Sequence, residues 1–503
     1  MSKIKIGWAE ESIIPEKKAS LAGQFYERIS EFVESDISVT AMALEADGEQ
    51  MIIASVDIVS MTDGHISIAR EKLAKLTNEI DPNKLIVAAT HTHTSLVLAG
   101  RNTTKGKDGS TISSAAAILE EFLPEGKAYT KKVVPDDTVN SPEESLELVT
   151  DKIALAAKNA WDAREDAYYA NEFGRAVVGM CRRVSYDDGS AQMWGDTNTA
   201  NFVALEGGND SGVELIYTFN KDKKLTGVVA NIACPAQILE QRSFISADYW
   251  GRAKAIVREK LGSDVFMLGL CGAGGDQCPR DLVRWVNPET PIDDPNVKRP
   301  NYIERKADPS MYDISGCNKA GKRIANEIVS VFEDIEDIKD EAIFKHEVIN
   351  LDVPLRKATM EEYNKAVREI EYYVDKNKDK EKFDFEDNAK MHVHAGLIAR
   401  YRDQQNKEVV PIEYHVIRLG DVAFVTNPYE LFLDYGNVIK ARSYAKQTFI
   451  VQLCCGSHGY LPTEKAEKAG HYSAYISSGD TGHEGGDLLV RESITNINKM
   501  WTE

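Results

Sequence analysis

The pattern of apolar and polar positions changes its period several times along the chain, which predicts an alternation of strands and helices. A continuous apolar run over 85–89 predicts a strand covered on both faces, because a half-exposed strand would alternate apolar and polar side chains. Helical periodicity over 64–79 precedes this run, and Asp47-Gly48 is typical of a hairpin turn. The first hundred residues therefore predict one α/β unit.

A second apolar block covers 225–280 and repeats this order. The segment 226–233 predicts a strand, 247–261 a helix and 263–270 a further strand, which together describe a βαβ unit. The glycines at 272, 274 and 275 follow, where small residues permit close approach of a ligand. The loop lacks both GxGxxG and GxxxxGK[ST], so it is not a phosphate-binding fingerprint.

The remaining segments complete an expected α/β fold in which large mixed sheets carry flanking helices. The segment 101–142 has little periodicity and predicts a lid or flexible loop, whereas 359–403 predicts an exposed helical hairpin. Near the carboxyl end, Gly420-Asp421 predicts a hairpin, and Pro428 is expected to open a helix with Glu430 in its first turn. We expect a single domain over 1–503, with internal halves at 1–335 and 336–503 as an option.

Composition says more about the classes of partner that this protein can bind than about its fold. The 503 residues carry a formal net charge of -20, which argues against nucleic acid and anionic membranes because both would be repelled. No apolar stretch is long enough to span a bilayer, so we expect a cytoplasmic protein that binds a small molecule; a homo-oligomer is compatible with the sequence. The odd cysteine set fits reduced thiols. Its members are Cys181, Cys234, Cys271, Cys278, Cys317, Cys454 and Cys455.

Two histidines follow the apolar run of 85–89 directly. In α/β sheets, ligands usually bind at the carboxyl ends of strands. With i, i+2 spacing in an extended segment, His91 and His93 would point to the same side. That pair suits a metal, or one ligand beside an acid/base group; a solvated loop is the alternative.

Later segments of the chain supply candidate partners. Glu430 is a candidate ligand, although an acid in a helix's first turn is also favoured by the helix dipole. His458 and His471 are acid/base candidates, since imidazole titrates near neutral pH. Asp276 and Asp248 would orient histidines, or would be ordinary turn and cap residues.

The order of these blocks resembles the neutral ceramidase family over nearly the whole chain. The blocks are THTH at 90–93, GDQCP at 275–279, NPYE at 427–430, and GYLPT at 459–463 followed by HY. The resemblance is closest to the amino-terminal catalytic domain of that family without its carboxyl-terminal immunoglobulin-like domain. It implies a zinc amidase in which two histidines, a glutamate and a tyrosine hold the metal.

Carried over by position, the resemblance assigns roles to individual residues. It implies metal ligands at His91, Glu430 and Tyr460, with His93 and Tyr472 at the site. An arginine near the substrate falls at Arg182 or Arg183. The expected catalytic set is His93, Cys278, Tyr472 and Asp276, the substrate-binding set is Arg182, Arg183, His458 and His471, and the metal set is His91, Cys234, Glu430 and Tyr460.

Two cysteines depart from the family pattern. Cys234 stands at or next to the family's second histidine ligand; a thiolate also binds zinc, but the change is equally compatible with weakened or lost metal binding. Cys278 replaces the family's serine and is either a nucleophile or a small buried hydrophobe.

Together these observations predict a zinc-dependent hydrolase acting on a small polar amide, ester or sugar-derived substrate rather than on ceramide. A metal-assisted lyase that performs β-elimination on an acidic sugar is the first alternative. A binding protein that has lost catalysis through the two cysteine changes is the second.

Overall fold

The computed structural model describes residues 1–503 except 101–102, 108, 110, 131–135, 284–312 and 503. Two mixed sheets dominate the described part. The larger has eight strands, in the spatial order β18 (Phe266–Cys271), β17 (Leu225–Ile232), β16 (Gly212–Asn220), β11 (Glu165–Arg175), β2 (Lys5–Ser12), β5 (Ser38–Ala46), β6 (Glu49–Val56) and β7 (Leu85–Ala89). The smaller contains β21 (Phe344–Pro354), β22 (Val409–Leu419), β23 (Val422–Thr426) and β25 (Gln447–Val451).

The larger sheet bends sharply between β2 and β11, which pair through only two residues of each strand. Because of this bend its two halves face each other. The rings of Trp8 on β2 and Phe266 on β18 stack at 5.8 Å, and Ser55 on β6 donates to the backbone of Gly269 on β18. The smaller sheet closes the third side, and one buried cluster joins side chains from all three groups of strands, including Leu44, Leu268 and Phe449.

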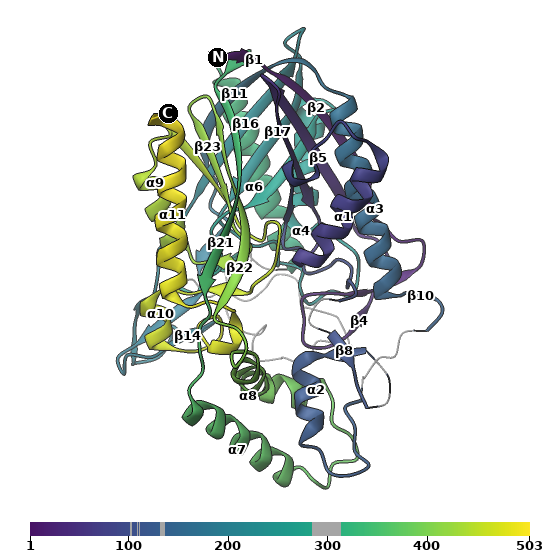
Figure 1. The fold of residues 1–503 in the computed structure, drawn as a ribbon, viewed down its shortest axis with the longest axis vertical. Helices are drawn as coiled ribbons and strands as arrows, with labels where there is room; N and C mark the ends of the chain where they lie inside the picture. Colours follow the sequence, from purple (N-terminus) through teal and green to yellow (C-terminus); the bar gives the residue numbers. More distant parts are fainter. Residues whose placement is uncertain (101–102, 108, 110, 131–135, 284–312, 503) are drawn as a thin grey trace.

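Helices cover the outer face of each strand group (Figure 1). α1 (Asp63–Leu76) and α3 (Pro142–Asp162) pack on β5 to β7, whereas α4 (Asp248–Leu261) and α6 (Asp313–Glu333) pack on β16 and β17. α9 (Leu433–Arg442) and α11 (His483–Thr502) cover the smaller sheet. The expected α/β class, with large mixed sheets and flanking helices, is confirmed. Strands buried on both faces explain the continuous apolar runs.

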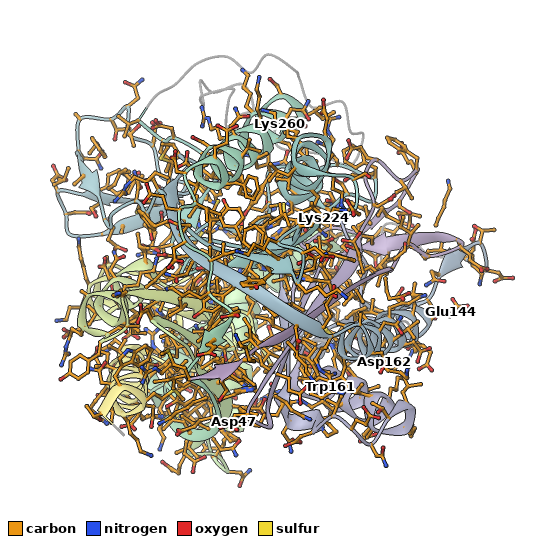
Figure 2. The ribbon with its side chains drawn as sticks, turned by 90° about the horizontal axis from the view of Figure 1, so that it is seen from above. Asp47, Glu144, Trp161, Asp162, Lys224 and Lys260 are labelled. Atoms are coloured by element: carbon orange, nitrogen blue, oxygen red, sulfur yellow. The ribbon has the colours of Figure 1, made fainter. Side chains whose placement is uncertain are left out.

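The α/β unit expected in the first hundred residues and the βαβ unit expected in the second block are both present. β6 and β7 are parallel and connected through α1, and β17 and β18 are parallel and connected through α4. Hairpins turn at Asp47-Gly48 and Gly420-Asp421 as expected. Figure 2 labels Asp47 and Lys224, which lie in turns at the end of the molecule seen from above. At the opposite end, Thr90 accepts from Ala236 after β17, and Gln452 after β25 donates to Cys271 of β18. The carboxyl ends of these strands therefore meet.

Helices α2 (Ser114–Glu121), α7 (Met360–Lys376) and α8 (Phe385–Asp403) lie below the sheets in Figure 1. The expected hairpin over 359–403 corresponds to α7 and α8. α8 is less exposed than expected, because Ala395 and Ile398 pack with Leu119 of α2.

The expected lid over 101–142 contains three short strands as well as α2, and part of it lies outside the described residues. Those strands are β8 (Thr103–Lys105), β9 (Thr111–Ser113) and β10 (Val139–Asn140). Among the helices of the described ranges, none combines the length and apolar character needed to cross a membrane.

Candidate active site

His91 lies just beyond the carboxyl end of β7, in a backbone conformation that few side chains adopt. The strand ends at Ala89, and His91 has a φ of 66°, so the segment is not extended as the spacing predicted. His91 Nδ1 lies 2.7 Å from the carbonyl oxygen of Val59. Because a carbonyl only accepts, Nδ1 carries a proton, and Nε2 is the ring nitrogen that faces away from this contact.

Glu430 occupies a short strand, and its expected place in a helix's first turn is wrong. It belongs to β24 (Glu430–Leu431), and α9 begins only at Leu433. β24 pairs in parallel with β26 (Tyr460–Leu461), which sets Glu430 beside Tyr460. This tertiary pairing, absent from the local sequence signal, overrides the helix start that Pro428 suggested.

The glycine loop after β18 allows this pairing to form. A Cβ on Gly275 would lie 2.2 Å from the carbonyl oxygen of Glu430, and Gly275 N–H donates to Leu431. Gly272 and Gly274 similarly face the backbone of Ala233 and Cys234. The loop was expected to let a ligand approach closely, but what approaches it is backbone of the same chain.

The carboxylate of Glu430 faces His91, with 3.5 Å between Oε2 and Nε2. Burial alone would raise the pKa of Glu430. The nearby His91 and Arg182, together with a hydrogen bond from Tyr460, outweigh burial and hold this pKa below its usual value. Two side chains of types that ligate cations thus converge in a buried place.

Arg182 and Arg183 are adjacent but point to opposite sides. Arg182 is buried and donates to the carbonyl of Gly275 at 2.9 Å and to the hydroxyl of Tyr460 at 3.2 Å. Arg183 forms a buried ion pair with Glu206 and donates to the carbonyl of Tyr472 at 3.0 Å. The structure therefore places Arg182 at the centre, while Arg183 fixes the backbone that carries Tyr472.

Aromatic and imidazole rings surround His91 and Glu430. The rings of Tyr460 and Tyr472 meet edge to face at 5.5 Å, and those of His91 and His93 at 4.8 Å. Burial and the charge of Glu430 raise the pKa of Tyr472, so its hydroxyl keeps its proton at neutral pH.

Sequence reasoning missed Glu240, whose Oε2 lies 3.5 Å from Nδ1 of His93. The sequence feature that could have identified Glu240 is its position in the segment after β17, which also contains Cys234. His392 on α8 also lies near the centre, with its ring 6.4 Å from that of Tyr472.

Neither departing cysteine meets the ligand atoms of His91 and Glu430. In the described part of the chain, the ligand atoms of His91, Glu430 and Cys234 do not all lie within 4.8 Å of one another. The Cys234 sulfur lies 3.6 Å from the carbonyl of Pro235, and burial raises its pKa well above the usual value. Burial also raises the pKa of Cys278 to about 12. Both thiols are therefore protonated at neutral pH, and all seven cysteines are buried and outside disulfides.

The two aspartates bind backbone N–H groups. Asp276 accepts from Leu433, at the start of α9, at 2.9 Å, and Asp248 accepts from Leu239 at 2.8 Å. Burial raises the pKa of each carboxyl to about 6. Their contacts fix the loops around the site.

His458 lies between Asp480, at 3.1 Å, and Asp63, at 3.5 Å. Although burial lowers its pKa, these carboxylates raise the pKa to about 9. His471 lies elsewhere and accepts from the backbone N–H of Met193.

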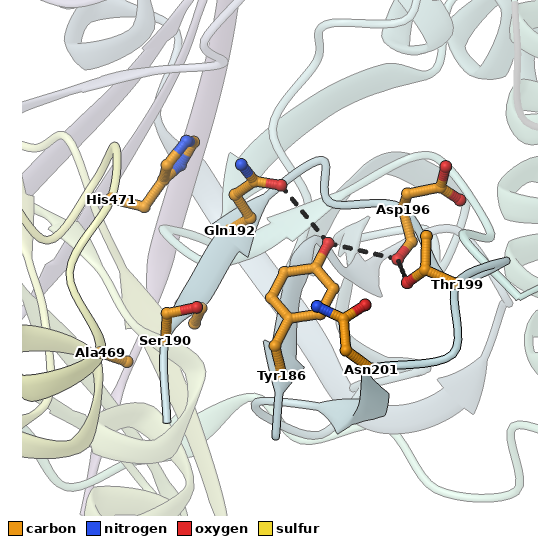
Figure 3. Close-up of a pocket in the computed structure, with 9 residues that line it drawn as sticks. Tyr186, Ser190, Gln192, Asp196, Thr199, Asn201, Ala469 and His471 are labelled. Atoms are coloured by element: carbon orange, nitrogen blue, oxygen red, sulfur yellow. Dashed lines mark hydrogen bonds between the residues drawn. The ribbon is translucent and has the colours of Figure 1, made fainter. Parts of the chain in front are cut away.

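His471 lines a polar pocket of about 500 Å³ beside the centre (Figure 3). The lining residues are Tyr186, Ser190, Ala191, Gln192, Asp196, Thr199, Asn201, Ala469 and His471. Since Tyr472 follows His471 directly, one short segment connects the pocket with the Tyr460 ring.

Comparison with solved structures identifies the fold class as that of neutral ceramidases. The crystal structure of neutral ceramidase from Pseudomonas aeruginosa matches with a TM-score of 0.64 and 11% identity, covering 99% of this chain and 75% of that one. A ceramidase complexed with C2 matches with a TM-score of 0.65 and 11% identity, covering 100% and 76%. No protein-family model and no curated protein matches the sequence. The resemblance to neutral ceramidases is thus confirmed for the fold.

Proposed function

We propose that this protein is a metal-dependent hydrolase, with zinc as the metal, acting on a small polar amide, ester or sugar-derived substrate. The observation that carries the proposal is the 3.5 Å approach of His91 Nε2 to the ionised carboxylate of Glu430. Once Nε2 carries no proton, the imidazole nitrogen and the carboxylate oxygen would both offer electron pairs to a shared cation. The ceramidase-like fold supports the same class of chemistry.

The residues present fit a borderline divalent cation. His91, Glu430 and Tyr460 would hold it, and nitrogen and oxygen donors of these types suit zinc. Cys234 is buried in the core and does not join the ligand atoms of His91 and Glu430, so we assign it a packing role. Bound zinc would polarise a carbonyl oxygen and lower the pKa of water.

The chain's own groups would handle orientation and protons. Glu240 lies 3.5 Å from Nδ1 of His93, and an imidazole beside a carboxylate is suited to proton transfer, so His93 is the candidate for moving a proton to or from the substrate. Arg182 donates to Tyr460 and keeps that hydroxyl in place. The protonated hydroxyl of Tyr472 is a hydrogen-bond donor toward a substrate oxygen.

A polar substrate is supported by the 500 Å³ pocket beside Tyr472. The hydroxyl, amide and carboxylate groups that line this pocket would bind a hydrogen-bonding substituent better than an acyl chain. The buried, unoxidised thiols fit a reducing compartment such as the cytoplasm.

The test begins with metal content and turnover of N-acylated amines, esters and acylated sugars. Protein treated with a chelator should lose hydrolysis, and stoichiometric zinc should restore it with incorporation of oxygen from isotopically labelled water. A product with new ultraviolet absorbance and no labelled oxygen would indicate the lyase instead. Absence of bound metal and of zinc-dependent turnover would reject both enzymes.

A further inference from the structure

A second cluster of reactive side chains lies between the sheets, away from the candidate metal centre. Glu413 and His415 project from β22, and Cys455 follows β25. His415 Nε2 lies 2.9 Å from Glu413 Oε1 and 3.5 Å from the sulfur of Cys455. His415 is fully buried, while the Glu413 side chain retains 22% exposure and gives the cluster a route to solvent.

The hydrogen-bond chain through this cluster fixes the protons on His415. The carbonyl oxygen of Gln50 accepts from Nδ1 of His346 at 2.8 Å. The neutral ring of His346 then accepts at Nε2, so the neighbouring Nδ1 of His415, at 2.8 Å, must donate. His415 Nε2 faces the acceptor Glu413, so it too carries a proton, and His415 is an imidazolium.

The charges around His415 require one more anion. Arg70 on α1 forms a two-pronged ion pair with Glu413, with contacts of 2.9 and 2.7 Å, and holds the pKa of Glu413 at about 2 together with His415 although burial opposes this. Arg70 and Glu413 neutralise each other. Cys455, 3.5 Å from His415 and 3.8 Å from Arg70, is the remaining group that can balance the imidazolium.

We propose that Cys455 is a thiolate and a site of oxidation by hydroperoxides, with the adjacent Cys454 as the second thiol. The thiolate attacks the peroxide oxygen, the O–O bond breaks, and Cys455 becomes a sulfenic acid while the leaving oxide takes up a proton. The Cys454 thiol then attacks the sulfenic sulfur, releasing water and forming a disulfide. The peroxide is reduced by two electrons in total.

The pKa of Cys455 agrees with this geometry. A hydrogen bond from the Cys454 thiol and the charges of His415 and Arg70 hold that pKa well below its usual value, against the effect of burial. Neighbouring Cα atoms are about 3.8 Å apart, shorter than in most disulfides, so the Cys454–Cys455 bond would be readily reduced.

A metal at Glu413, His415 and Cys455 is the competing occupant, because their ligand atoms lie within 4.8 Å of one another. Arg70 argues against it. Its guanidinium already contacts both oxygens of Glu413, and a divalent cation would add two charges beside it.

The cluster also contacts the strand that leads to His91. Cys455 N–H donates to the carbonyl of Val87 on β7 at 2.9 Å, and Ala89 N–H donates to that of Leu453 at 3.1 Å. Oxidation would therefore strain the segment that carries the candidate metal ligand. This consequence rests on the proposed function, whereas the thiolate itself does not.

The first measurement is the ultraviolet absorbance of thiolate as a function of pH, in wild type and Cys455→Ser. The difference should show one thiolate already at about pH 7, below the ordinary cysteine pKa of about 8.5. A difference that emerges only above about pH 8.5 would overturn the proposal. Neither result depends on access of a reagent or on hydrolase activity.

The second measurement is mass spectrometry of the tryptic peptide Gln447–Lys465 after treatment with equimolar hydrogen peroxide. We expect loss of two hydrogens, reversed by a dithiol, in wild type and in the control Cys317→Ser. Cys454→Ser should yield a trappable sulfenic acid, and Glu413→Gln should react about ten-fold more slowly. Oxidation of Cys455 no faster than that of Cys317, or a bound zinc lost in Cys455→Ser but retained in His91→Ala, would overturn it.

Discussion

The Nε2 atom of His91 and the Oε2 atom of Glu430 lie 3.5 Å apart, although one follows β7 and the other lies on β24 near the carboxyl end of the chain. The contact depends on two backbone features, the positive φ of His91 and the pairing of β24 with β26. A strained residue at a meeting point of this kind suggests a functional constraint.

Removing either donor should abolish metal binding. We expect His91→Ala and Glu430→Gln to weaken zinc affinity by at least about 100-fold and to reduce hydrolysis in proportion, because each removes a proposed direct ligand. Isothermal titration with zinc measures affinity without a substrate. His483→Gln, at the start of α11, is the matched control and should bind zinc normally. Unchanged affinity in Glu430→Gln would contradict the assignment.

Gly275→Ala tests the backbone approach behind Glu430. The new Cβ would meet the carbonyl of Glu430, which should cost about 1 to 3 kcal/mol of stability and displace the carboxylate. Gly208→Ala, where a Cβ meets no atom within 4 Å, is the control. Chemical denaturation and zinc titration would compare Gly275→Ala with Gly208→Ala. Equal stability and equal zinc affinity of the two variants would contradict the expected displacement of Glu430.

Gly23→Ala tests the placement of His93. A Cβ on Gly23 would lie 2.6 Å from the His93 ring, so we expect kcat to fall by about 10-fold with zinc stoichiometry unchanged. Gly48→Ala is matched in backbone strain, since both glycines have positive φ, but its Cβ would have no neighbour. Comparable losses of kcat in the two variants would mean that strain, not His93, is responsible.

Cys278→Ser should retain hydrolysis within about two-fold. Burial raises the pKa of this thiol to about 12, so very little of the nucleophilic thiolate exists at neutral pH. Steady-state kinetics on the substrate found in the first screen would check this. A loss of about 100-fold, with zinc still bound, would restore Cys278 as the nucleophile.

Stability should fall in acid partly through His346. Burial lowers its pKa from 6.5 to about 3, so between these values the unfolded chain binds a proton that the folded chain does not. The free energy of unfolding therefore decreases as pH falls through this window, by about 1.4 kcal/mol per pH unit for one such group. His346→Gln should show a shallower decrease in urea titrations from pH 6.5 to 4. If the free energy of unfolding fell equally with pH in wild type and His346→Gln, groups other than His346 would cause the acid sensitivity.

Local pattern alone predicted the elements whose signals lie within a few turns of chain. The apolar run at 85–89, the helix that became α1 and the turn at Asp47-Gly48 all formed near their expected bounds, because burial on both faces and turn chemistry are read from neighbouring residues. Periodicity predicted only the α/β class, whereas the order of the motifs suggested the neutral ceramidase fold.

The sequence by itself determined the α/β class, the strand end that carries His91 and His93, and a set of candidate partners. Only the tertiary structure decided which candidates meet. Parallel pairing with β26 turned Glu430 away from a helix start, and different hydrogen-bond partners separated the side chain of Arg182 from that of Arg183. The Cys455 cluster had no sequence signal, because Arg70, His346, His415 and Cys455 come from four separate segments. Charge balance and hydrogen bonding act across space, and the fold alone brings these groups within their range.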